Sequence, residues 1–96
     1  MKQQLIRQTL QASTWTSFEF SIPCRSFFVK NFTSSDIYVS FEQEDNTNTS
    51  FKIPTMIGEE IFISNRQDTN TNWLKNTVYV YSTSGGEVEV QELDIQ

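Results

Sequence analysis

Residues 27–41 read FFVKNFTSSDIYVSF, and this stretch decides the expected fold. Side chains of an extended chain alternate between two sides with a period of two. Ile37, Val39 and Phe41 therefore share one side, while Tyr38 and Ser40 share the other. A second apolar run at residues 27–29 precedes the polar turn at residues 33–36. The pattern predicts a β-hairpin over residues 27–41.

The same spacing recurs near the C-terminus. Phe27, Val29, Ile37 and Val39 match four valines at one constant offset, namely Val78, Val80, Val88 and Val90. The polar turn at residues 33–36 falls opposite SGGE at residues 84–87. Two adjacent glycines can take the positive φ angles that tight hairpin turns require. We therefore expect a closing hairpin of residues 77–82 and 87–91.

Composition and spacing extend this prediction to the whole chain. The 96 residues are enough for one domain and include 8 Phe, 3 Tyr and 2 Trp but one alanine. Further strands are expected at residues 14–22, 51–53 and 59–64, with polar loops at residues 42–50 and 65–72. Turns about every eight to twelve residues are typical of an antiparallel β-sandwich or jelly roll, here of about seven to eight short strands. The fold class is all-β.

Three further predictions concern residues 1–12, Pro23 and the last strand near Glu92. Residues 1–12 are interpreted as a first strand or as an N-terminal arm. Proline lacks a backbone donor, so the strand that starts at residue 14 should stop at Pro23. In a flat strand Leu93 would face the side opposite to Val88 and Val90, although it is apolar as they are. This predicts a bulge or a strand end near Glu92.

Charge disfavours two classes of partner. The formal net charge is -5, and the seven Lys and Arg residues are scattered along the sequence. This balance disfavours nucleic acid and anionic membrane surfaces. No apolar run approaches the length of a bilayer span, and the first residues do not resemble a secretory signal, so a soluble protein is expected. Cys24 is the one cysteine, which rules out an internal disulfide and is interpreted as an incidental thiol.

The residues needed for common catalytic chemistry are missing. The chain has no histidine, which removes the commonest general base and every Cys-His or Ser-His nucleophile pair. The carboxylates are interpreted as solvated charge rather than as an acid-base pair; they are Glu42, Glu44, Asp45, Glu59 and Glu60. Asp68-Thr69-Asn70-Thr71-Asn72 resembles the start of a calcium loop, but Trp73 and Tyr79 occupy the glycine and glutamate positions. We expect a non-enzymatic protein without a metal or cofactor.

Aromatic residues provide the candidate interaction surface, which consists of Trp73, Tyr79 and Tyr81, and Trp15 is considered as a further member of this face. If Val78 and Val80 point into the core, Tyr79 and Tyr81 face outward together and can stack on sugars or bind a partner. The alternative is that both sides of this strand, and Trp15, are covered within one sandwich.

Beyond about residue 25 the chain resembles small virion structural proteins of tailed bacteriophages. That family pairs a Val-Lys-Asn strand with an Ile-Pro strand and ends in a glycine hairpin. The matching segments are Phe28-Val29-Lys30-Asn31-Phe32, Asp36-Ile37-Tyr38-Val39-Ser40, Lys52-Ile53-Pro54, Glu60-Ile61-Phe62-Ile63, Thr77-Val78-Tyr79-Val80-Tyr81 and Gly85-Gly86-Glu87-Val88-Glu89-Val90.

The resemblance implies a virion protein, assembled in the host cytoplasm, that decorates or stabilises the capsid through protein–protein contacts. Its implied partners are other virion proteins, chiefly the major capsid protein, and further copies of itself in a trimer or ring. The alternative function is a receptor-binding or carbohydrate-binding module of a tail or baseplate.

Overall fold

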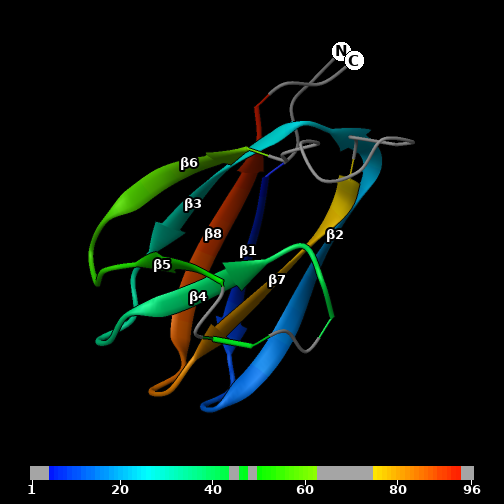
Figure 1. Ribbon diagram of the computed structural model, residues 1–96. Coiled ribbons are helices and arrows are strands. Elements are labelled where there is room, and N and C mark those ends of the chain that lie inside the picture. Colours follow the sequence, from blue (N-terminus) through cyan, green and yellow to red (C-terminus); the bar gives the residue numbers. More distant parts are fainter. Residues whose placement is uncertain (1–4, 44–45, 48–49, 63–74, 94–96) are drawn as a thin grey trace.

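The computed structural model describes residues 5–43, 46–47, 50–62 and 75–93. These residues contain eight strands and no helix, which confirms the predicted all-β sandwich (Figure 1). The strands are β1 (Leu5–Leu10), β2 (Thr14–Cys24), β3 (Ser26–Asn31), β4 (Ile37–Ser40), β5 (Phe51–Ile53), β6 (Gly58–Phe62), β7 (Lys75–Ser82) and β8 (Gly86–Glu92).

The described strands form two four-stranded sheets in which every pairing is antiparallel. Sheet A has the order β1-β8-β3-β6, and sheet B has the order β2-β7-β4-β5. The first strand thus pairs with the eighth, the second with the seventh, the third with the sixth and the fourth with the fifth. A chain that folds back on itself in this way and wraps around a core is a jelly roll.

The two predicted hairpins are wrong as pairings. β3 lies in sheet A and β4 in sheet B, and β7 and β8 are divided in the same manner. The turns at residues 32–36 and 83–85 therefore carry the chain from one sheet to the other. Alternation could not reveal this, because a strand that faces its neighbour across a sandwich core has the same inward period as one that pairs with it.

The sequence repeat is explained by how these two units interleave. Val29 of β3 lies opposite Val90 of β8, and Val39 of β4 lies opposite Val80 of β7. Each unit thus contributes one strand to the centre of each sheet. The eight apolar residues matched by the repeat are all fully buried.

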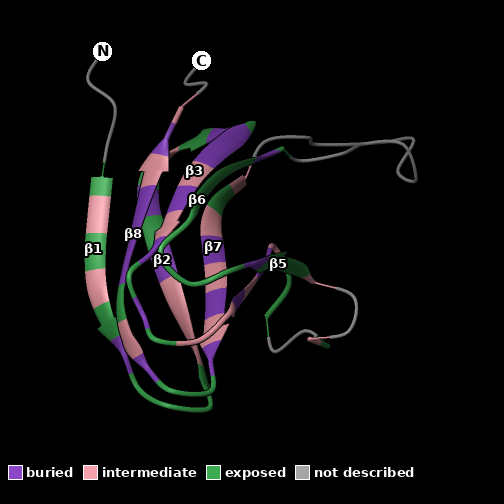
Figure 2. Ribbon diagram, turned by 90° about the vertical axis from the view of Figure 1, so that its left-hand side faces the viewer, coloured by how far each residue is buried: buried purple, intermediate pink, exposed green. Residues whose placement is uncertain are grey.

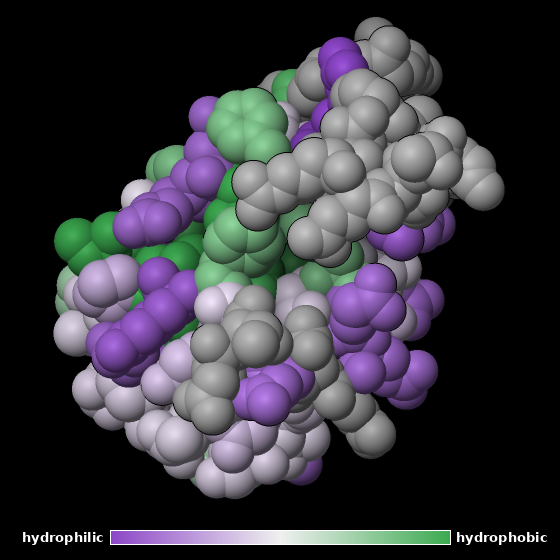
Figure 3. Space-filling model, viewed as in Figure 1, coloured by the Kyte–Doolittle hydropathy of each residue, from purple (hydrophilic) through white to green (hydrophobic). Residues whose placement is uncertain are grey.

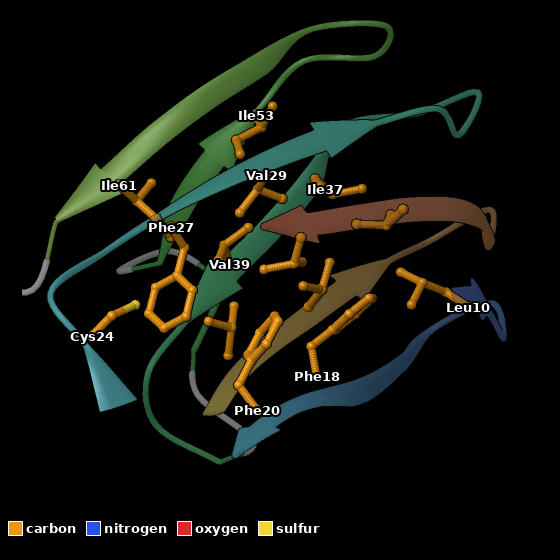
Figure 4. Packing of buried hydrophobic residues seen from close by; sticks show 14 residues of the cluster. Leu10, Phe18, Phe20, Cys24, Phe27, Val29, Ile37, Val39, Ile53 and Ile61 are labelled. Carbon is orange, nitrogen blue, oxygen red and sulfur yellow. The ribbon is translucent and has the colours of Figure 1, made fainter. Parts of the chain in front are cut away.

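The core lies between the sheets, as the close-up in Figure 4 shows. Buried residues alternate with more exposed ones along β7 (Figure 2). The ring centroid of Phe27 lies 5.7 Å from that of Phe20 and 5.8 Å from that of Phe41. The buried apolar cluster of the described residues consists of Leu10, Phe18, Phe20, Cys24, Phe27, Val29, Ile37, Val39, Ile53, Ile61, Val78, Val80, Val88 and Val90.

The predictions for the N-terminal segment and for the end of the last strand agree with the structure, whereas the predicted strand end at Pro23 does not. Residues 5–10 form a first strand at the edge of sheet A, and β8 ends at Glu92 as predicted. β2 continues through Pro23 to Cys24, so the predicted stop is wrong. A register shift between Glu19 and Cys24 explains the difference, since a proline is tolerated where the regular ladder is interrupted.

Two features hold the turns that connect the sheets. Gly85 and Gly86 have φ angles of 72° and 125°, as the sequence predicts, and a Cβ at position 85 would lie 2.8 Å from the carbonyl oxygen of Leu10. In the other turn, the buried side chain of Asn31 donates hydrogen bonds to the carbonyls of Ser35 (2.9 Å) and Ile53 (3.1 Å). Its Oδ1 accepts from the backbone N–H (2.8 Å) and hydroxyl (2.7 Å) of Thr33. Asn31 therefore connects sheet A to β5 of sheet B.

Candidate functional site

The outer face of sheet B carries a row of three aromatic side chains. Tyr81 of β7 lies opposite Trp15 of β2 on one side and Tyr38 of β4 on the other. The ring centroids are 5.3 Å apart for Trp15 and Tyr81 and 6.3 Å apart for Tyr38 and Tyr81, with tilted planes. Tilted rings at such separations attract one another through their quadrupoles. The row is therefore held in place by its own packing.

A hollow of about 420 Å³ lies beside this row. In the next cross-strand position Ser17 of β2 lies opposite Tyr79 of β7, one step away from the Trp15–Tyr81 pair. A small serine between two large aromatic residues leaves space above the sheet. We call this depression the sheet B hollow; the described residues that line it are Ser13, Thr14, Trp15, Ser17, Gln43 and Tyr79.

The structure places the predicted interaction residues as follows. Tyr79 and Tyr81 are half-buried on the outer face of β7, because Val78 and Val80 are buried in the core. Trp73 lies outside the described residues. Trp15, which is considered above for this face, and Tyr38, which is not, lie on the same face. The parity of Tyr38 relative to Ile37 and Val39 was the signal that could have found it, and the parity of Trp15 relative to Phe18 favours the outward position for Trp15.

The outer face of sheet A is charged instead. The nearly buried carboxylate of Glu89 lies 2.7 Å from Nη2 of Arg7 and 3.4 Å from Nζ of Lys30. The hydrogen bond from Arg7 is the main reason that the pKa of Glu89 is lowered. Arg7 and Lys30 remain substantially exposed, so this network contributes little to stability. We interpret it as a solvated surface rather than as a catalytic site.

Exposed apolar side chains lie at both ends of β6, the edge strand of sheet A, and on the neighbouring residues that precede β6 and follow β3. We define the apolar edge as Phe32, Met56, Ile57 and Phe62, whose exposed fractions are 44%, 68%, 45% and 60%. A shallow hollow of about 150 Å³ is lined by Phe32, Met56 and Ile57 together with Phe28. Figure 3 shows hydrophobic atoms on the side of the molecule where β5 and β6 lie, and paler, near-neutral colours over the lower part of the sheet B face.

Cys24 lies at the other end of the core from Leu10 (Figure 4), and Glu92 is a second buried titratable group that interacts with it. The thiol of Cys24 donates to the carbonyl of Ser26 at 3.1 Å, and burial together with the charge of Glu92 raises its pKa to about 11. Glu92 is fully buried, and within the described part of the chain neither carboxyl oxygen has a hydrogen-bond partner. Burial raises the pKa of Glu92. Cys24 is therefore a buried, neutral thiol at physiological pH and not an activated nucleophile.

The described residues supply no metal centre. No three of their cysteine, aspartate and glutamate side chains come together as ligands. Glu42, Glu59 and Glu60 are exposed, while Glu44, Asp45 and the run at residues 68–72 lie outside the described residues. The part of the chain that the structure describes also contains no helix able to span a membrane.

The chain matches no family model, and no curated protein or solved structure is significantly similar to it.

Proposed function

We propose that this protein is a non-enzymatic structural component of a bacteriophage virion that decorates or stabilises the capsid through contacts with other protein copies. Its sequence segments resemble small virion proteins, and the jelly roll is an architecture that viral capsid domains use. Fold alone does not specify a role. The observation that supports the proposal most is the apolar edge.

The apolar edge combines two features that favour association. β6 pairs with β3 on one side and has no strand on its other side among the described residues. An open edge strand exposes backbone donors and acceptors that can pair with another chain, and monomeric proteins usually protect such edges. Met56 and Phe62 add exposed apolar surface at both ends of β6. A partner that covers this edge gains both a hydrogen-bond ladder and apolar burial.

The partner that fits best is a second copy of the same chain. β1 is the opposite edge of sheet A, and the registers make β6 antiparallel to β1 within that sheet. A neighbouring copy in the same orientation therefore presents its β1 antiparallel to β6. Glu59 and Glu60 are exposed on β6, and Arg7 is exposed on β1. A head-to-tail contact of this kind closes into a ring when the rotation between copies permits it.

The oligomeric state tests this proposal. Light scattering coupled to size exclusion should show a trimer or larger ring, and Met56→Lys combined with Phe62→Lys should shift it to a monomer with an unchanged circular dichroism spectrum. Phe51→Lys is the control, because Phe51 is an exposed aromatic residue on β5 of sheet B, and this substitution should leave the oligomer intact. A monomer at every concentration, or an oligomer that the Met56→Lys and Phe62→Lys substitutions leave unchanged, would contradict the proposed interface. Mass spectrometry of purified particles should find many copies of the chain per virion.

A further inference from the structure

We propose that the sheet B hollow binds a neutral oligosaccharide. This site is independent of the proposed assembly contact, because the hollow lies on the outer face of sheet B whereas the apolar edge belongs to sheet A. The inference rests on the size of the hollow, the kinds of side chain that line it and the rigidity of its rim.

The size of the hollow suits a small ligand. Its volume of about 420 Å³ falls within the range of about 300–1,000 Å³ found for small-molecule sites. The hollow is open above Ser17 and flanked by Trp15 and Tyr79, so a ligand can lie along the sheet surface between the two rings. A sugar chain has this elongated shape.

The two aromatic side chains provide the apolar part of the site. One face of a pyranose ring presents C–H groups, and the electron-rich face of an aromatic ring attracts them. Trp15 is already packed against Tyr81 at a centroid distance of 5.3 Å. Its indole is therefore positioned before a ligand arrives, which lowers the entropy that binding must offset.

The polar groups of the hollow are uncharged and match sugar hydroxyls. Each of the six described lining side chains carries a hydroxyl, an amide or an indole N–H. The hydroxyl of Ser17 donates to Glu19 at 3.3 Å, and that of Thr14 donates to the carbonyl of Ala12 at 3.2 Å. Both oxygens keep lone pairs that can accept from a ligand O–H. The carboxylate of Glu19 beside Ser17 repels anions, so the site favours neutral sugars over sialylated or phosphorylated ones.

The rim is fixed by contacts from neighbouring strands. Ser13 has a φ angle of 57°, which is uncommon for a residue other than glycine, and its backbone N–H donates to Ser82 at 2.7 Å. The side-chain amide of Gln8 donates to the carbonyl of Ser17 at 2.8 Å from the opposite sheet. A site on such a rigid support keeps its polar groups at constant positions.

A protein partner fits this hollow less well. The cores of protein interfaces are dry and mainly apolar, and burying this many hydroxyl and amide groups against apolar side chains would leave them without hydrogen bonds. Saccharides supply a hydroxyl on nearly every ring carbon, so they can satisfy these groups while their C–H faces contact Trp15 and Tyr79.

The test is isothermal titration calorimetry of the full chain with each of four sugars, namely maltohexaose, cellohexaose, chitohexaose and mannohexaose. We expect at least one to bind with a millimolar or lower Kd. In a Trp73→Phe background Trp15 is the only tryptophan, so its fluorescence should change with the same Kd. Trp15→Ala and Ser17→Leu should each weaken binding by about tenfold or more, the first by removing the stacking ring and the second by filling the hollow.

Tyr38→Ser is the matched control, because Tyr38 lies on the same face but does not line the hollow. This variant should retain binding within about twofold. Ser17→Leu changes an outward-facing residue of β2 and should fold normally, which keeps the test decisive if Trp15→Ala is unstable. The inference is overturned if none of the four sugars binds, if Ser17→Leu binds as well as the parent chain, or if sialyllactose binds more tightly than all four. The variant with Met56→Lys and Phe62→Lys should bind the same sugar with an unchanged Kd even if it no longer forms the oligomer.

Discussion

Replacement of Asn31 should be the most destabilising polar substitution in the described part of the chain. Asn31 is 1% exposed, and its side chain takes part in four hydrogen bonds with Thr33, Ser35 and Ile53. Each such bond contributes about 0.5–1.5 kcal/mol net. Thr33 keeps a second acceptor for its hydroxyl, the Ser35 carbonyl at 2.8 Å, so part of the loss is recovered. We expect Asn31→Ala to lower the free energy of unfolding by about 2–4 kcal/mol.

This loss is large for a small domain. A chain of this length has a total stability of about 5–14 kcal/mol, and each kcal/mol corresponds to about 4–8 °C in Tm. Urea denaturation followed by circular dichroism measures the difference. Asn76→Ala is the matched control, because Asn76 is exposed and its side-chain amide donates a hydrogen bond to the carbonyl of Phe20 at 3.1 Å. This substitution should lower the free energy of unfolding by less than about 1 kcal/mol.

Asn31→Asp tests the direction of the hydrogen bonds. It keeps an acceptor for Thr33 but turns an oxygen toward the carbonyls of Ser35 and Ile53, so at pH 7 it should be at least as destabilising as Asn31→Ala. Protonation of the new carboxyl at low pH restores one donor and should narrow its difference from the parent chain. If Asn31→Ala costs less than about 1 kcal/mol, or if Asn31→Asp is as stable as the parent at pH 7, the network does not hold this turn.

Three further predictions concern the buried pair and the glycine turn. Glu92→Met should raise the free energy of unfolding at pH 7 by about 1–3 kcal/mol, because it removes a buried carboxyl whose oxygens accept no hydrogen bond from the described residues. The folded-state pKa of Glu92 is raised, so its contribution to stability is present at low pH and is lost as the pH rises above the unfolded pKa of about 4.3. The gain in unfolding free energy from Glu92→Met should therefore increase as the pH rises over that range. A gain that does not change with pH would contradict the reasoning. The Cys24 thiol, with a pKa of about 11, should react with a thiol reagent only after denaturation, and rapid labelling of the folded chain would show that it is accessible. Gly85→Ala should cost at least about 1–2 kcal/mol in urea denaturation, because it combines a positive φ with a close approach to the Leu10 carbonyl, and a neutral effect would mean that this turn relaxes freely.

The candidate site was only partly predictable. Tyr79 and Tyr81 follow from alternation on one strand, since their neighbours Val78 and Val80 are apolar. Trp15 and Tyr38 have the correct parity on their own strands, but their meeting with Tyr81 depends on which strands are neighbours in sheet B. The hollow above Ser17 likewise exists only because Tyr79 lies opposite it.

The sequence by itself determined the strand period, most of the strand positions and the inward side of each repeated strand, because alternation depends on local backbone geometry. It also determined the positive φ angles at Gly85 and Gly86. Only the tertiary structure decided that the strands flanking residues 33–36 and 84–87 lie in different sheets. Strand pairing is set by contacts between residues distant in the sequence, and facing strands across a core and paired strands within a sheet present the same alternating pattern.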